Sequence, residues 1–420
     1  MKLIASLLPG ARARQPKCTL PLLLALVLTL GVLLAAGCSD DEGTVTFPQP
    51  EPAPSRDWLF AVHGTDPNNV YAAGNRGAMF HFDGTDWSYV DIGADQAITR
   101  IWGPGDGTLL ACGHGGKIWR NTGGSWSPME SGTSQDLYNI GDYQGDVHVC
   151  GRAGALRILN GSSWGSTNTD SIVVRNPVDL SALDTLQLKS DIYSLTTVNY
   201  YFFGGAFKDP DWIGEPNGMV GTDGMVMGED VPPFVGDPPV QAPKFDWRMR
   251  TLRGDQLAAS EWVLSSSSDE TILSNNYLGT SEGWLFTLGE ELTGALVWRK
   301  MFPDMTDKPG AGIRAMWMDS NANLYMVTDQ GQVIFQTPNY NFDENQGLRK
   351  VLFDGTNGLS SIWGSDTDNI YFVGLVENTI YKAALDLSDT TLVVDPITVD
   401  FPAKGKSIDP FVDELGRPRF

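Results

Sequence analysis

The stretch Val70-Tyr-Ala-Ala-Gly74-Asn-Arg-Gly77-Ala-Met-Phe-His-Phe-Asp83-Gly84 decides the fold. Two short runs of apolar and small residues flank a Gly-Asn-Arg-Gly turn, and an Asp-Gly turn ends the second run. Because Gly, Asn and Asp are the residues that tight turns require, this pattern predicts two antiparallel strands joined by a short turn.

The same pattern returns twice along the chain, at residues 109–120 and 147–159. The glycines that end the first run, Gly74, Gly113 and Gly151, are 39 and 38 residues apart. Tryptophans further along each unit keep the same two spacings, at Trp87, Trp126 and Trp164. A period near 40 residues with several short strands per unit is typical of a β-propeller, whose blades stack around an axis.

The far end of the chain repeats itself in a related way. Ile313–Trp317 and Leu324–Val327 correspond to Leu359–Trp363 and Ile370–Val373, 46 residues later. Two divergent units fit between the two sets, at about residues 191–252 and 261–301. In them we expect a third strand near Gly218-Met-Val and a second strand near Thr271-Ile-Leu, respectively. The sequence therefore predicts an all-β protein with a single β-propeller of seven blades, with six or eight as alternatives.

Three motifs give these repeats a family resemblance: residues 116–133 around Lys-Ile-Trp-Arg-Asn-Thr-Gly-Gly-Ser-Trp126, Ile-Trp-Gly at 101–103, and Phe82-Asp-Gly-Thr-Asp-Trp87. They resemble the repeats of bacterial BNR/Asp-box-like, photosystem II assembly factor-like propellers found in surface lipoproteins. The resemblance implies a propeller fold displayed at the cell envelope. In such blades the glycine before the second turn is expected to adopt a positive φ, and the tryptophans to pack on the neighbouring blade.

The N-terminus carries an export signal. A basic segment precedes an apolar run from Leu20 to Leu34, and Ala-Ala-Gly leads to Cys38. The segment resembles a bacterial lipoprotein signal peptide at residues 1–37, which implies diacylglycerol and palmitate on Cys38. Ser39 after that cysteine favours the outer membrane of a Gram-negative bacterium. A plain signal peptide and an anchor helix are the alternatives.

The remaining boundaries follow from composition. Residues 38–56 form the lipidated cysteine and a Pro-rich tether, 57–402 the propeller, and 403–420 a C-terminal tail. The chain has 29 basic and 51 acidic side chains and a net charge of -22. Because phosphate recognition needs a positive field, this charge argues against nucleic-acid binding.

The sequence predicts neither a metal site nor a cofactor. The four histidines, at positions 63, 81, 114 and 148, lack the spacing of metal ligands. Cys112 and Cys150 hold equivalent positions in adjacent blades. They could form a disulfide, but the favoured interpretation is two buried thiols. Acidic turns such as Asp319–Asn323 are interpreted as tight turns rather than calcium sites.

The turns between the second and third strands of blades 1 to 3 carry basic residues. Arg76, His114 and Arg152 lie in these turns. Because equivalent turns of a propeller share one face, the three side chains form a small basic arc in the prediction. Such an arc would bind a carboxylate or an acidic chain end, whereas the alternative is three separate solvated side chains.

A long insertion in the fourth unit supplies a second candidate site. Trp212 stands among Asp209, Asp211 and Glu215 in a Pro-rich loop. Long loops on a rigid scaffold often carry binding residues, and a tryptophan flanked by carboxylates suits a sugar or a protein partner.

These observations favour a non-catalytic binding or assembly module, lipid-anchored in the membrane, whose partner is a protein or polysaccharide of the cell envelope. The alternative is a sialidase-like glycoside hydrolase or a polysaccharide lyase. The arginines do not follow the three-arginine pattern of sialidases, and no complete Ser-x-Asp-x-Gly-x-Thr-Trp box is present. A passive structural coat protein is a third hypothesis.

Overall fold

The computed structural model describes residues 57–143, 146–166, 171–175, 182–187, 192–198, 200–206, 224–229, 247–249, 263–267, 276–290, 296–301, 311–338, 340 and 347–401. All of them belong to the second of two compact units, Pro54–Phe420. The predicted signal peptide, tether and C-terminal tail lie outside the described residues.

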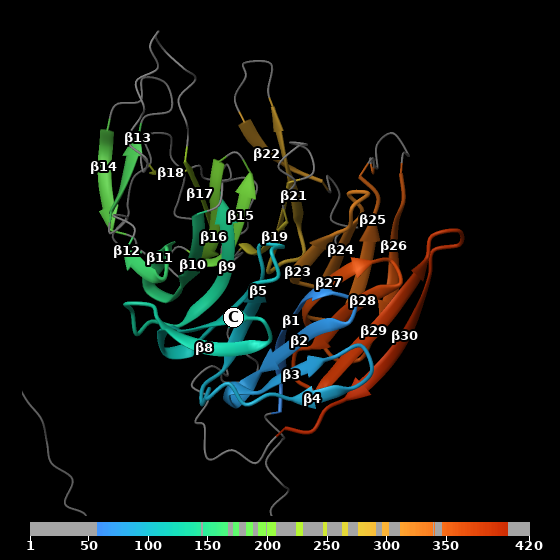
Figure 1. Cartoon of the computed structure of the whole chain (residues 1–420). Helices are drawn as coiled ribbons and strands as arrows, with labels where there is room; N and C mark the ends of the chain where they lie inside the picture. The colour runs from blue at the N-terminus through green and yellow to red at the C-terminus, as the bar shows by residue number, and fades with distance from the viewer. Residues whose placement is uncertain are drawn as a thin grey trace, which may run out of the picture. The chain divides into compact units, whose positions relative to one another are not determined.

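Seven four-stranded antiparallel sheets and one two-stranded sheet make up the described part of the chain. Each four-stranded sheet consists of four consecutive strands in simple up-and-down order, as expected of propeller blades. We number the sheets as blades 1 to 7 in chain order (Figure 1). The seven sheets agree with the number of repeat units in the sequence.

Blade 1 consists of β1 (Leu59–Asp66), β2 (Asn69–Gly74), β3 (Met79–Phe82) and β4 (Trp87–Tyr89). Blade 2 consists of β5 (Ile98–Trp102), β6 (Leu109–Gly113), β7 (Lys117–Thr122) and β8 (Ser125–Glu130). Blade 3 consists of β9 (Leu137–Tyr143), β10 (Asp146–Gly151), β11 (Leu156–Asn160) and β12 (Ser163–Ser166). The two-stranded sheet, β13 (Ser171–Arg175) and β14 (Ala182–Gln187), follows blade 3.

Blade 4 consists of β15 (Ile192–Val198), β16 (Tyr200–Ala206), β17 (Gly224–Glu229) and β18 (Trp247–Met249). Blade 5 consists of β19 (Val263–Ser267), β20 (Tyr277–Thr280), β21 (Leu285–Glu290) and β22 (Leu296–Lys300). Blade 6 consists of β23 (Ile313–Met318), β24 (Leu324–Thr328), β25 (Gln332–Gln336) and β26 (Arg349–Asp354). Blade 7 consists of β27 (Leu359–Asp366), β28 (Asn369–Gly374), β29 (Thr379–Asp386) and β30 (Thr391–Thr398).

The first strands of the blades are neighbours in sequence order, and β27 of blade 7 returns to β1 of blade 1. At this junction the amide of Val62 donates to Oγ of Ser361 at 3.2 Å, and the Tyr371 hydroxyl donates to the carbonyl of Pro67 at 3.4 Å. Both blades are complete from their own segments. Packing and side-chain hydrogen bonds therefore close the ring, with no strand shared between the two ends of the propeller.

The hydrophobic core lies between adjacent blades. Val70 and Ala72 of β2 pack against blade 7, whereas Tyr71 and Ala73 pack against blade 2. Successive residues of a strand point to opposite faces, so an inner strand of apolar residues serves both neighbours at once. Each large apolar side chain that is buried in this way contributes roughly 1.5–3 kcal/mol, which is why the blades stack rather than stand alone.

Two strands of the divergent blades were wrongly placed from the sequence. The motif Gly-Met-Val occurs at Gly218 and again at Gly224, and the third strand of blade 4 is β17, which begins at the second copy. Pairing decides this, because Met227 lies opposite Phe203 of β16. In blade 5 the second strand begins at Tyr277 rather than near Thr271, since its residues align with β19 and are fully buried. The hairpin β13–β14 was not expected.

The described part of the chain contains no helix that is long and apolar enough to cross a membrane.

Candidate functional site

A β-bulge occurs at the same place in the first strand of every blade. In each blade the second residue of the first strand has no partner on the second strand, whereas the residues on either side of it are paired. The skipped residues are Phe60, Thr99, Tyr138, Tyr193, Leu264, Arg314 and Ser360. A bulge bends its strand and redirects the side chain of the extra residue. Seven residues of unrelated type thus share one structural position.

Six of these bulge residues line a single cavity of about 70 Å³. Nine of the described residues line it, and they come from blades 1, 2, 3, 4, 6 and 7: Phe60, Thr99, Arg100, Tyr138, Asn139, Tyr193, Arg314, Ser360 and Leu375. Six blades therefore build the cavity jointly, since none of them contributes more than two of these lining residues. We call it the central cavity.

The central cavity has a positive lining. Among the described lining residues, Arg100 and Arg314 are charged and none is acidic. Nη2 of Arg314 lies 3.8 Å from Oδ2 of Asp329, which stands outside the lining. Within the described part of the chain the Arg100 side chain has neither an ion pair nor a hydrogen bond, and its Nε is buried. Burial lowers the pKa of the Arg100 guanidinium, which still carries its charge at neutral pH.

Hydrogen bonds from side chains of one blade hold the opening of the next blade's first strand. Oγ1 of Thr99 donates to the Leu137 carbonyl at 2.6 Å, and Oγ of Ser360 donates to the Leu59 carbonyl at 3.1 Å. These bonds satisfy carbonyls where the bulge interrupts the ladder. They also commit two hydroxyl groups of the cavity wall to the scaffold.

Aromatic and amide groups complete the wall. The rings of Tyr138 and Tyr193 stack with centroids 5.3 Å apart. Nδ2 of Asn139 donates to the Tyr193 carbonyl at 3.3 Å. Blades 3 and 4 are therefore tied together at the cavity, while Phe60 and Leu375 add apolar surface.

The three predicted turns are equivalent, as expected. Each forms a three-residue 3₁₀ turn, at Asn75–Gly77, His114–Gly116 and Arg152–Gly154. The predicted basic residues are nevertheless not at the same position. Arg76 is the second residue of its turn, with φ 56°, whereas His114 and Arg152 are the first of theirs.

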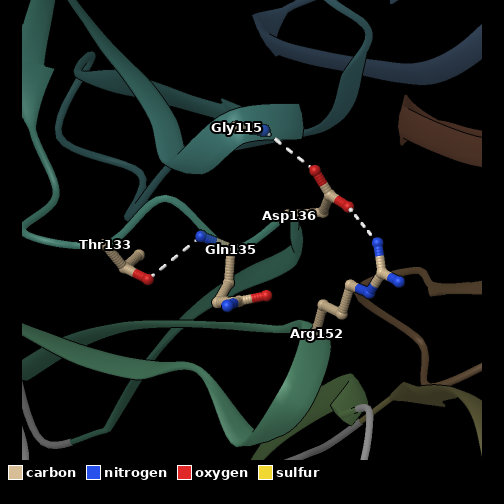
Figure 2. A network of polar contacts seen from close by, with 5 residues as sticks. All are labelled: Gly115, Thr133, Gln135, Asp136 and Arg152. Carbon is tan, nitrogen blue, oxygen red and sulfur yellow. Dashed lines mark hydrogen bonds and ion pairs between the residues drawn. The ribbon is translucent and has the colours of Figure 1, made fainter. Parts of the chain in front are cut away.

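Both arginines of these turns have acidic partners. Arg76 forms an ion pair with Asp57, and its guanidinium lies 5.8 Å from the centroid of the Phe401 ring. Nη1 of Arg152 lies 3.4 Å from Oδ2 of Asp136 (Figure 2). His114 is buried. The positive charge of the predicted arc is thus locally balanced at both arginines.

The turns and the central cavity lie at the same end of the blades. The amide of His114 donates to the Ala97 carbonyl, and the amide of Leu375 donates to the Gly358 carbonyl in the same way. Leu375 therefore holds in blade 7 the position of His114 in blade 2, and Leu375 lines the cavity. We call this end of the blades the turn face.

The glycines before these turns do not adopt the expected positive φ. The φ angles of Gly74, Gly113 and Gly151 are -165°, -169° and -177°, which any residue adopts. A Cβ at these positions would lie 1.9, 2.1 and 2.0 Å from the carbonyl oxygens of Trp58, Ala97 and Asp136, respectively. Glycine is required because the chain that enters the first strand passes too close for any side chain.

The remaining predictions have mixed outcomes. Cys112 and Cys150 are free and buried, and the second thiol contacts the Ile192 carbonyl at 3.4 Å. Asp319 accepts hydrogen bonds from the amides of Asn321 and Asn323, as a tight turn requires. Over the described residues no group of three or more His, Cys, Asp or Glu side chains could hold a metal ion.

Five candidate residues cannot be placed. Cys38 and the insertion residues Asp209, Asp211, Trp212 and Glu215 lie outside the described residues. The central cavity itself was missed, because neither the skipped residues nor Arg100 share a motif that marks them in the sequence.

A comparison with curated proteins finds similarity to the "Immune protein Tsi7" of Pseudomonas aeruginosa, with 31% identity over 154 residues. The match covers 34% of this chain and 48% of the relative. The chain thus spans about half the length of the curated relative it matches. No protein-family model matches the sequence.

Solved structures show the fold. The WD40 β-propeller domain of Doa1 superposes with a TM-score of 0.51 at 10% identity, covering 82% of this chain and 94% of that domain. YCF48 from Cyanidioschyzon merolae gives a TM-score of 0.48 at 14% identity, covering 77% of this chain and 94% of that protein. With its repeated four-stranded sheets, the chain is a β-propeller.

Proposed function

We propose that this chain is an exported, lipid-anchored β-propeller that binds a protein partner through the turn face. The observation that carries the proposal is the central cavity, a positively lined depression whose nine described lining residues include no carboxylate. Glycoside hydrolysis ordinarily needs a pair of carboxylates at the reacting bond. The cavity lining favours binding over that chemistry.

The similarity to an immune protein supports a protein as the partner. The name of that relative, an immune protein, states no catalysed reaction. By that likeness, we propose that this chain acts by occupying another protein, with rigid blades fixing the geometry and the turn face providing the contact. The proposed contact includes three residues of this face, Arg76, His114 and Arg152. The insertion with Trp212 is proposed as a second contact.

The proposed location is the cell envelope of a Gram-negative bacterium, with the lipid on Cys38 in the outer membrane. It is supported by the signal-like segment at residues 1–37. Metabolic labelling with a palmitate analogue tests the anchor. The label is expected on the full chain and lost in Cys38→Ser, whereas a label retained in that variant would contradict it.

Two exposed residues at opposite ends of the blades allow a sharp test of the turn face. Gln135 stands beside the opening of β9 on the turn face, and Asn321 stands in the β23–β24 turn at the other end. Each residue is held through its backbone amide, which donates a hydrogen bond to the side chain of Thr133 or Asp319, respectively. A bulky side chain at either position should therefore leave the fold intact.

The test uses the full chain and its Gln135→Trp and Asn321→Trp variants. Envelope proteins cross-linked to each are identified, and the best candidate is purified and mixed with the chain. We expect a complex of fixed stoichiometry by light scattering, weakened at least tenfold by Gln135→Trp and unchanged by Asn321→Trp. Release of reducing sugars from envelope polysaccharide, with no such complex, would favour the hydrolase or lyase instead.

A further inference from the structure

We propose that the central cavity is a carboxylate-binding site in which Arg100, together with Arg314, holds one carboxylate carried on a short apolar stem. Where that carboxylate belongs to a protein, the inference rests on the proposed function. The site itself stands on the geometry of the cavity alone.

Arg100 is the lining residue whose charge an anion would balance. It comes from β5, lines the central cavity, and has no ion pair or hydrogen bond within the described chain. The residue is partly buried and its Nε is fully buried. Partial withdrawal of a guanidinium from water without a counter-charge costs free energy, and that cost falls when an anion enters beside it. In a chain with 51 acidic side chains, a cavity whose described lining holds two arginines and no carboxylate is suited to receiving one from elsewhere.

The charge of the cavity favours a monoanion. Asp329 lies 3.8 Å from Arg314 and partly balances it, whereas Arg100 has no ion pair within the described chain, so one guanidinium is available to an anion. A carboxylate matches that charge, and its two oxygens match the paired N–H groups of a guanidinium. A phosphate dianion would bring one negative charge too many.

The neutral part of the wall defines the rest of the ligand. The hydroxyls of Thr99 and Ser360 already donate to backbone carbonyls, as does the Asn139 amide, and the guanidinium groups are the charged donors of the wall. Phe60 and Leu375 offer apolar surface in a cavity of about 70 Å³. That volume suits a carboxylate with a few carbon atoms, as in a glutamate side chain, the C-terminal residue of a polypeptide or a short free acid.

The first experiment uses the full chain alone and three probes: butyrate, its neutral analogue butyramide, and inorganic phosphate. Affinity is measured by titration calorimetry, with Arg100→Gln and Arg314→Gln as test variants. Arg157→Gln is the matched control, because Arg157 lies outside the cavity and bonds to the adjacent Leu156 carbonyl. We expect saturable butyrate binding in the wild type and the control, and at least a tenfold loss in Arg100→Gln.

Stability without ligand gives an independent readout. Removing a partly buried charge that has no partner within the described chain should leave Arg100→Gln at least as stable toward urea as the wild type. Butyramide binding as tightly as butyrate, unchanged butyrate binding in Arg100→Gln, or tighter binding of phosphate would each overturn the proposal.

A second arm distinguishes the source of the carboxylate. Short peptides ending in a free C-terminus are compared with their C-terminally amidated forms, and with peptides carrying an internal glutamate. Binding of either carboxylate form supports a protein ligand, and binding of butyrate alone supports a free acid. If butyrate binds while no protein complex forms, the carboxylate site stands and the proposed function fails.

Discussion

Oδ2 of Asp136 lies 3.4 Å from Nη1 of Arg152, and Oδ1 of the same carboxylate accepts a hydrogen bond from the Gly115 amide at 2.9 Å. One side chain at the opening of blade 3 thereby joins the turns of blades 2 and 3 (Figure 2). The turn face is held together by such contacts between blades, beside the cavity we propose as the binding site.

The two interactions of the Asp136 carboxylate, with the Gly115 amide and with Arg152, should contribute differently to stability. Asp136→Ala is expected to lower the free energy of unfolding by about 2–3 kcal/mol, because the Gly115 amide loses a charged acceptor. Arg152→Gln should cost less than about 1 kcal/mol, since the Arg152 side chain is 53% exposed and water screens the pair. Urea-unfolding midpoints measure both, and equal losses would contradict this division.

Two glycines of blade 3 provide a matched test of close packing. Gly151→Ala should destabilise the protein by about 3 kcal/mol, because the new Cβ would overlap the Asp136 carbonyl oxygen 2.0 Å away. Gly141→Ala should change stability by less than about 1 kcal/mol, because its nearest neighbour is the Leu195 Cβ at 3.6 Å. Melting temperatures of the two variants are compared, and a tolerated Gly151→Ala would refute the packing argument.

The Thr99 hydroxyl should stabilise the junction of blades 2 and 3. Thr99→Val keeps the shape of the side chain but leaves the Leu137 carbonyl without its donor at 2.6 Å. The expected loss is about 1–3 kcal/mol in urea unfolding. Thr122→Val, at an exposed position in β7, is the control and should be neutral.

His63 should make the protein sensitive to acid. Burial, with a smaller effect from Arg100, lowers the pKa of His63 from 6.5 to about 3. Between these two pH values the unfolded chain binds a proton at His63 that the folded chain does not bind. The contribution of His63 to stability is therefore complete above pH 6.5 and is lost progressively as the pH falls toward 3.

The measurement is urea unfolding between pH 7 and pH 3.5 for the wild type and His63→Gln. We expect a shallower decline in the variant across this range. Parallel curves would show that His63 does not titrate differently in the folded and unfolded chains.

The buried thiols should respond in the opposite pH range. Burial raises the pKa of Cys112 from 9.0 to about 12 and also raises that of Cys150. Their contribution to stability is full below pH 9 and falls as the pH rises above it, because the unfolded chain then loses thiol protons first. Iodoacetamide followed by peptide mass spectrometry should show both thiols unmodified in the folded chain at pH 8 and modified in urea.

Local chemistry made part of this fold predictable. The spacing of Gly74, Gly113 and Gly151 marked the blades, because each glycine allows a close backbone approach within its own blade. Asp319 marked a turn, because its carboxylate accepts hydrogen bonds inside that turn. Where a motif occurs twice, as Gly-Met-Val does at 218 and 224, local pattern could not choose between the copies. Pairing with β16 chose the second.

The sequence by itself determined the all-β class, the repeat, the turn positions and the acidic character, all of which rest on spacing and composition. Only the tertiary structure decided the central cavity. Phe60, Thr99 and Arg314 have no chemistry in common, yet each is the residue that its strand pairing skips. Such a skip depends on how the two strands of a hairpin align rather than on residue type, and the cavity forms only where several blades meet. No local pattern therefore marks Arg314, or Arg100 beside the skipped Thr99, as a cavity residue.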